Sequence, residues 1–274
     1  MSISLRTILT PVDFSARSEN AVAYASRLAR HYRAELTLLH VLEPVHNNFA
    51  MAELPDFAEQ VAKAQREHAQ FQLDQFATAD LQGIQVRRII SPCEPRCGVA
   101  DEILTHALHA DLVVMPTQGH GRVREFLLGS VTAKVLHDCP VPVLTDVHLS
   151  AQAEPFDWKV SHILCAIDFG PESANVLKWC SSLAAEFGAK VTVIHADSDA
   201  QALDQLKQKV ATAGLEAKSI VTPGEPHDVV TSAAKECNAD LLIIGRGSND
   251  GTLARLRAQA YSIVRQSPCP VLSV

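Results

Sequence analysis

Glycine, arginine and serine are concentrated in one segment, "PTQGHGRVREFLLGS", which extends from Pro116 to Ser130. It follows a short apolar run, "DLVVM", and precedes a run with helical character, "VTAKVLH". Glycine lets a ligand approach the backbone without a side chain in the way, and the first N–H groups of a helix favour an anion. The segment could therefore hold a phosphate, although an ordinary surface loop could have the same composition.

Asp13 is a second candidate, because it follows the apolar run "TILTPV" directly. A carboxylate at the carboxyl end of a strand can accept hydrogen bonds from a ribose hydroxyl or a purine amine. Asp13, or the serine before "ARSENAV", could instead cap the helix that follows, and Ser130 could cap the helix after the glycine-rich segment. Position alone leaves both interpretations open.

These residues belong to a sequence repeat. The segment 8–40 aligns without gaps with the segment 163–195, and 12 of the 33 positions are identical. The identical pairs include Asp13 with Asp168, Phe14 with Phe169, and His40 with His195. Later matches follow in the same order, so we expect one domain used twice, at 1–147 and 158–274, joined by a polar segment that contains Pro155.

Apolar runs alternate with helical patterns in each repeat, which is typical of βαβ units and a parallel sheet. In the first repeat we expect strands at 7–12, 35–42, 85–91, 111–115 and 141–145, giving an open five-stranded α/β sheet with helices on both faces. A helical face within 55–81 is predicted to pack on this sheet; it consists of Phe57, Val61, Ala64, His68, Phe71 and Phe76. A shorter counterpart is expected at 200–213.

The composition favours a soluble globular protein, with 47% hydrophobic and 20% charged residues. A net charge of −7 and the lack of a Lys/Arg run disfavour nucleic acid and anionic membranes as partners. There is no signal-peptide pattern and no apolar run long enough for a membrane span. Seven cysteines without a repeated spacing indicate a reducing compartment, so we expect a cytoplasmic protein.

Taken together, "PVDFS", "LLHVLEP", "ADLVVM" and "LLGSVTAKVLHDCPVPVL" resemble a tandem universal stress protein. Gly119, nine residues, and then Gly129-Ser130 reproduce most of the loop pattern of that family. The resemblance implies two Rossmann-like, adenine nucleotide alpha hydrolase-like domains, and it implies ATP or a related adenine nucleotide as ligand, with or without Mg²⁺. The contacts that it implies for the purine and ribose are Pro11, Asp13 and Val41, and those for the phosphates are Met115, Gly119, Gly129, Ser130 and Val131. Pro116 stands where the pattern has its first glycine, and proline offers no N–H to a ligand.

The second repeat departs further from this pattern. Its segment "GRGSNDGTLARLRAQAYSIV" keeps Gly245 but has Arg257-Ala258 where the first repeat has Gly-Ser. We therefore expect a degenerate domain with a structural role. Arg246, Arg255 and Arg257 either supply an anion site by charge or are solvated surface residues.

No catalytic constellation is visible elsewhere. His106 and His109 lack a third metal ligand, and Cys93 and Cys97 have neither redox nor zinc spacing. The expected function is a stress-response regulator that binds a nucleotide without robust catalysis; a nucleotide-independent scaffold and a slow ATPase remain alternatives. The final strands, "VPVLT" and "CPVLSV", could pair across a sheet edge, which suggests pseudo-twofold pairing of the halves or a homodimer, besides an unknown protein partner.

Overall fold

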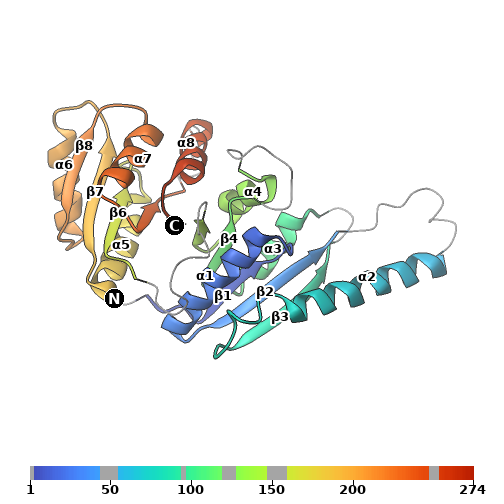
Figure 1. Cartoon of the computed structure of the whole chain (residues 1–274). Coiled ribbons are helices and arrows are strands. Elements are labelled where there is room, and N and C mark those ends of the chain that lie inside the picture. The colour runs from blue at the N-terminus through green and yellow to red at the C-terminus, as the bar shows by residue number, and fades with distance from the viewer. Residues whose placement is uncertain (1–2, 44–54, 94–96, 119–127, 147–158, 247–252) are drawn as a thin grey trace.

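The computed structural model describes residues 3–43, 55–93, 97–118, 128–146, 159–246 and 253–274, and strands alternate with helices within each half (Figure 1). The elements of the first half are β1 (Thr7–Pro11), α1 (Ala16–Tyr32), β2 (Glu35–Leu42), α2 (Pro55–Gln75), β3 (Val86–Pro92), α3 (Val99–Ala107), β4 (Leu112–Pro116), α4 (Ser130–Asp138) and β5 (Val143–Asp146). Those of the second half are β6 (His162–Ala166), α5 (Ser173–Phe187), β7 (Lys190–Ala196), α6 (Ala202–Thr212), β8 (Lys218–Thr222), α7 (Pro226–Glu236), β9 (Leu241–Ile244), α8 (Leu253–Gln266) and β10 (Val271–Ser273).

All ten strands form one sheet in the order β3-β2-β1-β4-β5-β10-β9-β6-β7-β8. Within each half the neighbouring strands are parallel, whereas β5 and β10 are antiparallel, with Leu144 opposite Leu272. The predicted α/β fold with two repeated parallel sheets is confirmed. The final strands of the halves pair with each other inside one chain, and we call this junction the seam.

Two hydrophobic cores lie on the two faces of the sheet, because successive strand residues point to opposite faces. Ile8 in β1 belongs to the core that contains residues of α1, α2, α5 and α6, whereas its neighbour Leu9 belongs to the core that contains residues of α3, α4, α7 and α8. Leu112 and Val113 in β4 divide in the same way. Each core contains residues of both halves, so apolar packing as well as strand pairing holds the halves together.

Polar contacts reinforce the seam. The guanidinium of Arg246 donates to the carbonyl oxygens of Cys139 (2.5 Å) and Val141 (3.1 Å), which belong to the first half. Burial lowers the pKa of Arg246, and the two carbonyl oxygens replace the water that burial removes. Tyr261 also donates to the carbonyl of Ala133 at 3.0 Å. The interpretation of Arg246 as a solvated surface arginine was therefore wrong, because its guanidinium is bonded to the first half.

The predicted face of residues 55–81 packs on the sheet only in part. Phe76, directly after α2, packs on the core and edge-on against Phe14, and the side chain of Phe57 lies outside the described residues. The buried positions of α2 are Ala69 and Leu73, whereas Phe71 is 66% exposed and Ala64 and His68 are exposed as well. The helix has 21 residues, or roughly 32 Å, while the neighbouring β3 has seven, or roughly 23 Å. Only the last turns of α2 can cover the sheet, and the helix extends past the sheet in Figure 1.

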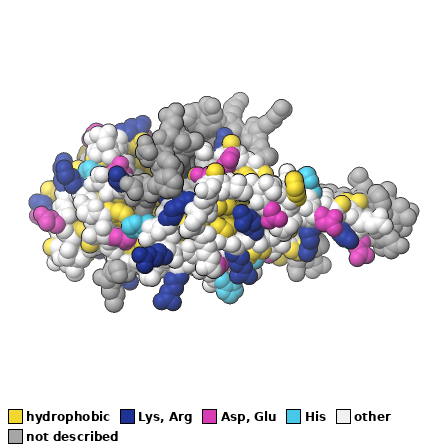
Figure 2. Space-filling model, turned by 60° about the horizontal axis from the view of Figure 1, so that its bottom comes forward, with side chains coloured by type: hydrophobic (Ala, Val, Ile, Leu, Met, Phe, Trp, Pro, Cys, Tyr) yellow, Lys and Arg dark blue, Asp and Glu magenta, His cyan; other side chains and the backbone are white. Residues whose placement is uncertain are grey.

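Charges of both signs are interspersed on the face of the molecule that Figure 2 shows, without a continuous basic stripe. A helix apolar and long enough to cross a bilayer does not occur among the described residues.

Candidate functional site

The carboxyl ends of three neighbouring strands bring most of the predicted site residues to one edge of the sheet. Strand β1 lies between β2 and β4, and Pro11 at the end of β1 pairs with Leu39 of β2, two residues before Val41. Met115 and Pro116 are the last two residues of β4, on the other side of β1. The side chains of Val41 and Met115 are buried in the core beneath α3 and α4, and those of Pro11 and Pro116 are partly exposed. This edge is where parallel α/β sheets bind their ligands.

Asp13 lies in the turn after β1, where its Oδ1 accepts hydrogen bonds from the backbone N–H (3.0 Å) and the hydroxyl (2.6 Å) of Ser15. Ser15 caps α1, because its Oγ accepts from the backbone N–H of Ser18 at 3.1 Å. Asp13 is therefore not the cap. The turn holds its partly exposed carboxylate at the ligand-binding edge of the sheet.

A phenylalanine and a histidine support the same turn in both halves, and the sequence interpretation gave them no role. His40 Nδ1 lies 2.8 Å from the carbonyl oxygen of Val12, and His195 Nδ1 lies 2.7 Å from that of Ile167. A carbonyl only accepts, so Nδ1 carries the proton in each. Phe14 and Phe169, at φ of 61° and 65°, lie against these imidazoles. The sequence could have indicated this role, because the phenylalanine and the histidine are identical in the two repeats.

The carboxyl end of the glycine-rich segment, at Gly129, is hydrogen-bonded to the residues at the end of β4. Gly129 is the N-cap of α4, and its N–H donates to the carbonyl of Thr117 at 2.9 Å, while Thr132 Oγ1 donates to that of Pro116 at 3.0 Å. Ser130 is the exposed first residue of the helix, so its interpretation as the N-cap was wrong. Glycine has no side chain to cap the first-turn N–H groups, and no side chain of the described residues takes that place, so these groups can donate to an external acceptor. Gly119 lies outside the described residues.

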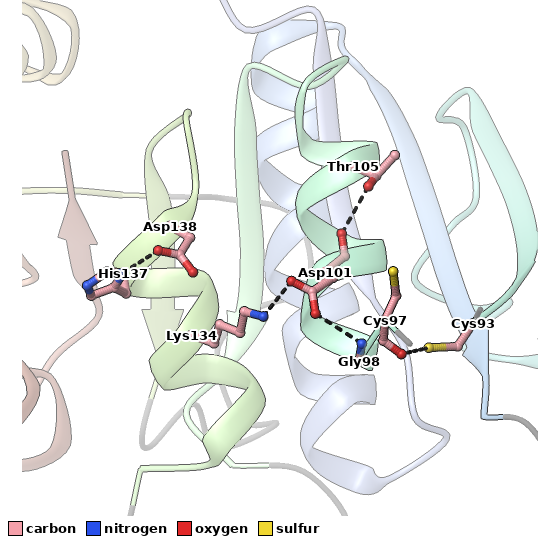
Figure 3. A network of polar contacts seen from close by, with 8 residues as sticks. All are labelled: Cys93, Cys97, Gly98, Asp101, Thr105, Lys134, His137 and Asp138. Carbon is pink, nitrogen blue, oxygen red and sulfur yellow. Dashed lines mark hydrogen bonds and ion pairs between the residues drawn. The ribbon is translucent and has the colours of Figure 1, made fainter. Parts of the chain in front are cut away.

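The lysine in α4 is committed to a structural ion pair. Lys134 pairs with Asp101 of α3, and Asp101 Oδ2 also accepts from the backbone N–H of Gly98 at 3.0 Å (Figure 3). The hydrogen bond from Lys134 lowers the pKa of Asp101 and, in turn, raises that of Lys134. Within the described part of the site, an anion would therefore depend on backbone N–H groups and the helix dipole.

The cysteine and histidine candidates have local partners. The Cys93 thiol donates to the carbonyl oxygen of Cys97 at 2.6 Å, and burial raises its pKa, which disfavours the reactive thiolate. His106 contacts Glu102 and Ser91 at 3.4 and 3.3 Å. The described residues include no group of three potential metal ligands.

At the corresponding edge of the second half, Asp168 is exposed and its Oδ1 accepts from the backbone N–H of Gly170 at 2.9 Å. Gly245 directly follows β9. A Cβ there would lie 3.2 Å from Cγ2 of Val176, so glycine permits a close approach between β9 and α5. The side chains of Arg255 and Arg257 lie outside the described residues.

Comparison with known proteins identifies the family to which this chain belongs. The family described as "Universal stress protein family" matches residues 4–146, 159–212 and 196–274. This chain belongs to the universal stress protein family. A universal stress protein of Mycolicibacterium smegmatis is 29% identical over 190 residues, which are 69% of this chain and 63% of that protein.

Two solved structures of universal stress proteins that match nearly the whole chain share its fold, one of them a protein named as a putative member from Pseudomonas aeruginosa. The one from Archaeoglobus fulgidus is 23% identical and has a TM-score of 0.68, covering 97% of this chain and 95% of its own. A shorter one from the same organism, solved in complex with dAMP, is 20% identical with a TM-score of 0.35, covering 41% of this chain and 95% of its own. The dAMP is a ligand of that protein.

Proposed function

We propose that the first domain of this universal stress protein binds ATP or a related adenine nucleotide and acts as a stress-response regulator without robust catalysis. The observation that carries the proposal is the uncapped start of α4, which Gly129 ties to the end of β4. The phosphates would accept from N–H groups near Ser130 and Val131, while Asp13 would accept from the ribose and Pro11, Val41 and Met115 would contact the apolar part of the nucleotide.

The chemistry of this arrangement suits binding. Backbone N–H groups and the positive end of the α4 dipole complement phosphate oxygens, and Mg²⁺, where present, would be held through the phosphates and water rather than by a protein cage. In the part of the chain that the structure describes, we find no base paired with a nucleophile at this edge. We therefore propose that nucleotide occupancy itself, in the cytoplasm, is what protein partners read.

Titration of the full-length protein with ATP, with and without Mg²⁺, tests the proposal. We expect saturable heat in calorimetry and a rise in unfolding temperature, because a ligand that binds the folded state stabilises it. Mass spectrometry of the freshly purified protein should also detect bound adenine nucleotide. Neither heat nor a thermal shift at millimolar ATP would show that the proposal is wrong and favour the nucleotide-independent scaffold.

Pro116 is the position at which this site departs most from the family pattern. A Pro116→Gly variant restores a backbone N–H and removes a ring at the end of β4, so we expect it to bind ATP up to about tenfold more tightly, the equivalent of one hydrogen bond. The Kd of the variant and the wild type, measured under the same conditions, checks this. Equal Kd values would show that Pro116 does not obstruct the ligand.

A further inference from the structure

The second half contains a cavity where its sequence predicts only a degenerate site. The cavity has a volume of about 290 Å³ and lies at the carboxyl ends of β6, β7 and β9, beside the start of α5. Apolar side chains form most of its wall, among them Ile167, Val176, Ile194, Val230, Ile244 and Ile263. This volume is at the lower end of the roughly 300–1,000 Å³ that is usual for small-molecule sites.

One buried hydroxyl in the cavity wall has no partner. Ser173 is 2% exposed, and its Oγ has no hydrogen-bond partner within the described structure. The equivalent serine of the first half, Ser18, donates its hydroxyl proton to the carbonyl of Ser15 at 2.9 Å. A buried hydroxyl without a partner is costly, so the contrast between the repeats points to an external partner for Ser173.

The difference arises from one position in the repeat. Ser15 is replaced by Gly170, whose carbonyl accepts from the backbone N–H of Ser173 at 3.1 Å instead of from its hydroxyl. The same replacement removes the hydroxyl that donates to Asp13 in the first half, so among the described residues Asp168 keeps only the backbone donor of Gly170. One hydroxyl and one carboxylate therefore have capacity for a ligand in the second half.

The charges around this cavity disfavour a phosphate. Its charged lining residues are Asp168 and Glu172, and none of the described residues in its lining is a lysine or arginine. Arg246, next to Gly245, donates to carbonyls of the first half and is near enough to Glu172 for their charges to interact, which leaves Asp168 as the carboxylate of the lining without a described cation. The cavity therefore suits a compact, uncharged ring system that carries hydroxyl donors.

We propose that the second domain binds a purine nucleoside without phosphates. Asp168 accepts from the ribose hydroxyls, the Ser173 hydroxyl bonds a polar atom of the ligand, and the isoleucine and valine side chains pack against the base. The choice of a nucleoside rests on the proposed function, since Ala166, Asp168 and Ala196 are the counterparts of Pro11, Asp13 and Val41, and all three line the cavity.

Adenosine and guanosine are the probes. Calorimetric titration of the full-length protein, first saturated with ATP, is expected to show one nucleoside site per chain, because ATP and the nucleoside occupy different domains. ATP binding is measured in a separate titration, which shows whether the proposed function of the first domain holds. If ATP does not bind, the nucleoside titration is run on the protein without ATP. No heat with either nucleoside at millimolar concentration, or complete displacement by ATP, would overturn the proposal.

Matched variants in the two repeats locate the site. Ser173→Ala and Asp168→Asn are each expected to weaken nucleoside binding by about tenfold, as expected for loss of one hydrogen bond. Ser18→Ala is expected to leave the nucleoside affinity unchanged. Loss of nucleoside binding in Asp13→Asn together with normal binding in Asp168→Asn would place the ligand in the first domain and reject the inference.

The stability of the ligand-free variants separates a binding role of Ser173 from a structural one. Ser173→Ala removes an unpartnered buried hydroxyl, so its urea midpoint should equal or exceed that of the wild type. Ser18→Ala removes a paired hydroxyl and should lower the midpoint. A marked loss of stability in Ser173→Ala, with normal nucleoside affinity, would show that the hydroxyl serves folding.

Discussion

A Gly129→Asp variant is expected to bind ATP about 100-fold more weakly than the wild type, since placing like charges together in a binding site costs several kcal/mol. The new carboxylate would lie at the start of α4, where the proposed triphosphate lies, and would accept from the same first-turn N–H groups. Aspartate is also a favourable N-cap, so the variant should unfold at the same or a higher urea concentration. Calorimetry and urea denaturation of one preparation measure both effects.

Gly129→Asn is the matched control for this substitution. Asparagine has nearly the same size and capping ability but no charge, so its effect on ATP affinity should be much smaller. A Cβ at Gly129 would meet its nearest atoms at 3.5–3.7 Å, which is ordinary contact, and both variants should fold. Unchanged ATP affinity in Gly129→Asp would show that the phosphates are not at α4, and equal losses in both variants would indicate a steric cause.

Arg246→Ala is expected to lower the free energy of unfolding by about 3 kcal/mol, since hydrogen bonds from a charged group contribute about 1.5–3 kcal/mol each. The substitution leaves the carbonyls of Cys139 and Val141 without their guanidinium partner at the seam. Equilibrium urea denaturation followed by circular dichroism measures the change.

Arg87→Ala is a suitable control for the general effect of replacing an arginine by alanine, because Arg87 is exposed on β3. Its effect should stay within about 0.5 kcal/mol, as is usual for surface substitutions. If Arg246→Ala also falls within that range, the hydrogen bonds of Arg246 contribute little to holding the two halves together.

The parts of the fold that depend on local pattern could be predicted from the sequence. The strand around Ile8 and Leu9 is buried on both faces, and such strands appear as short apolar runs between turn residues. The repeat then placed Asp13 and Asp168 at equivalent strand ends, and the apolar final strands indicated the pairing that joins Leu144 and Leu272. The strands themselves are set by residues close together in the chain, and the repeat and the apolar character of the final strands indicated how the two halves correspond and pair.

Two of the features that were missed depend on distant residues, and a third depends on a local replacement within the repeat. Leu73 is buried and Phe71 is exposed because the sheet lies beneath only part of α2. The hydrophobic periodicity of α2 gives no information about the extent of the sheet. Arg246 depends on carbonyl groups more than 100 positions away. The free hydroxyl of Ser173 results from the replacement of Ser15 by Gly170, and its effect becomes visible only when the hydrogen bonds of the two turns are compared.

The antiparallel seam determines which way the two proposed sites face. Because β5 and β10 run in opposite directions, the carboxyl ends of the first five strands and those of the last five lie at opposite edges of the sheet. A small partner that covers a ligand on one domain cannot touch a ligand on the other. The chain could thus present two independent signals to two partners at the same time, and any influence between the sites would have to pass through the sheet itself.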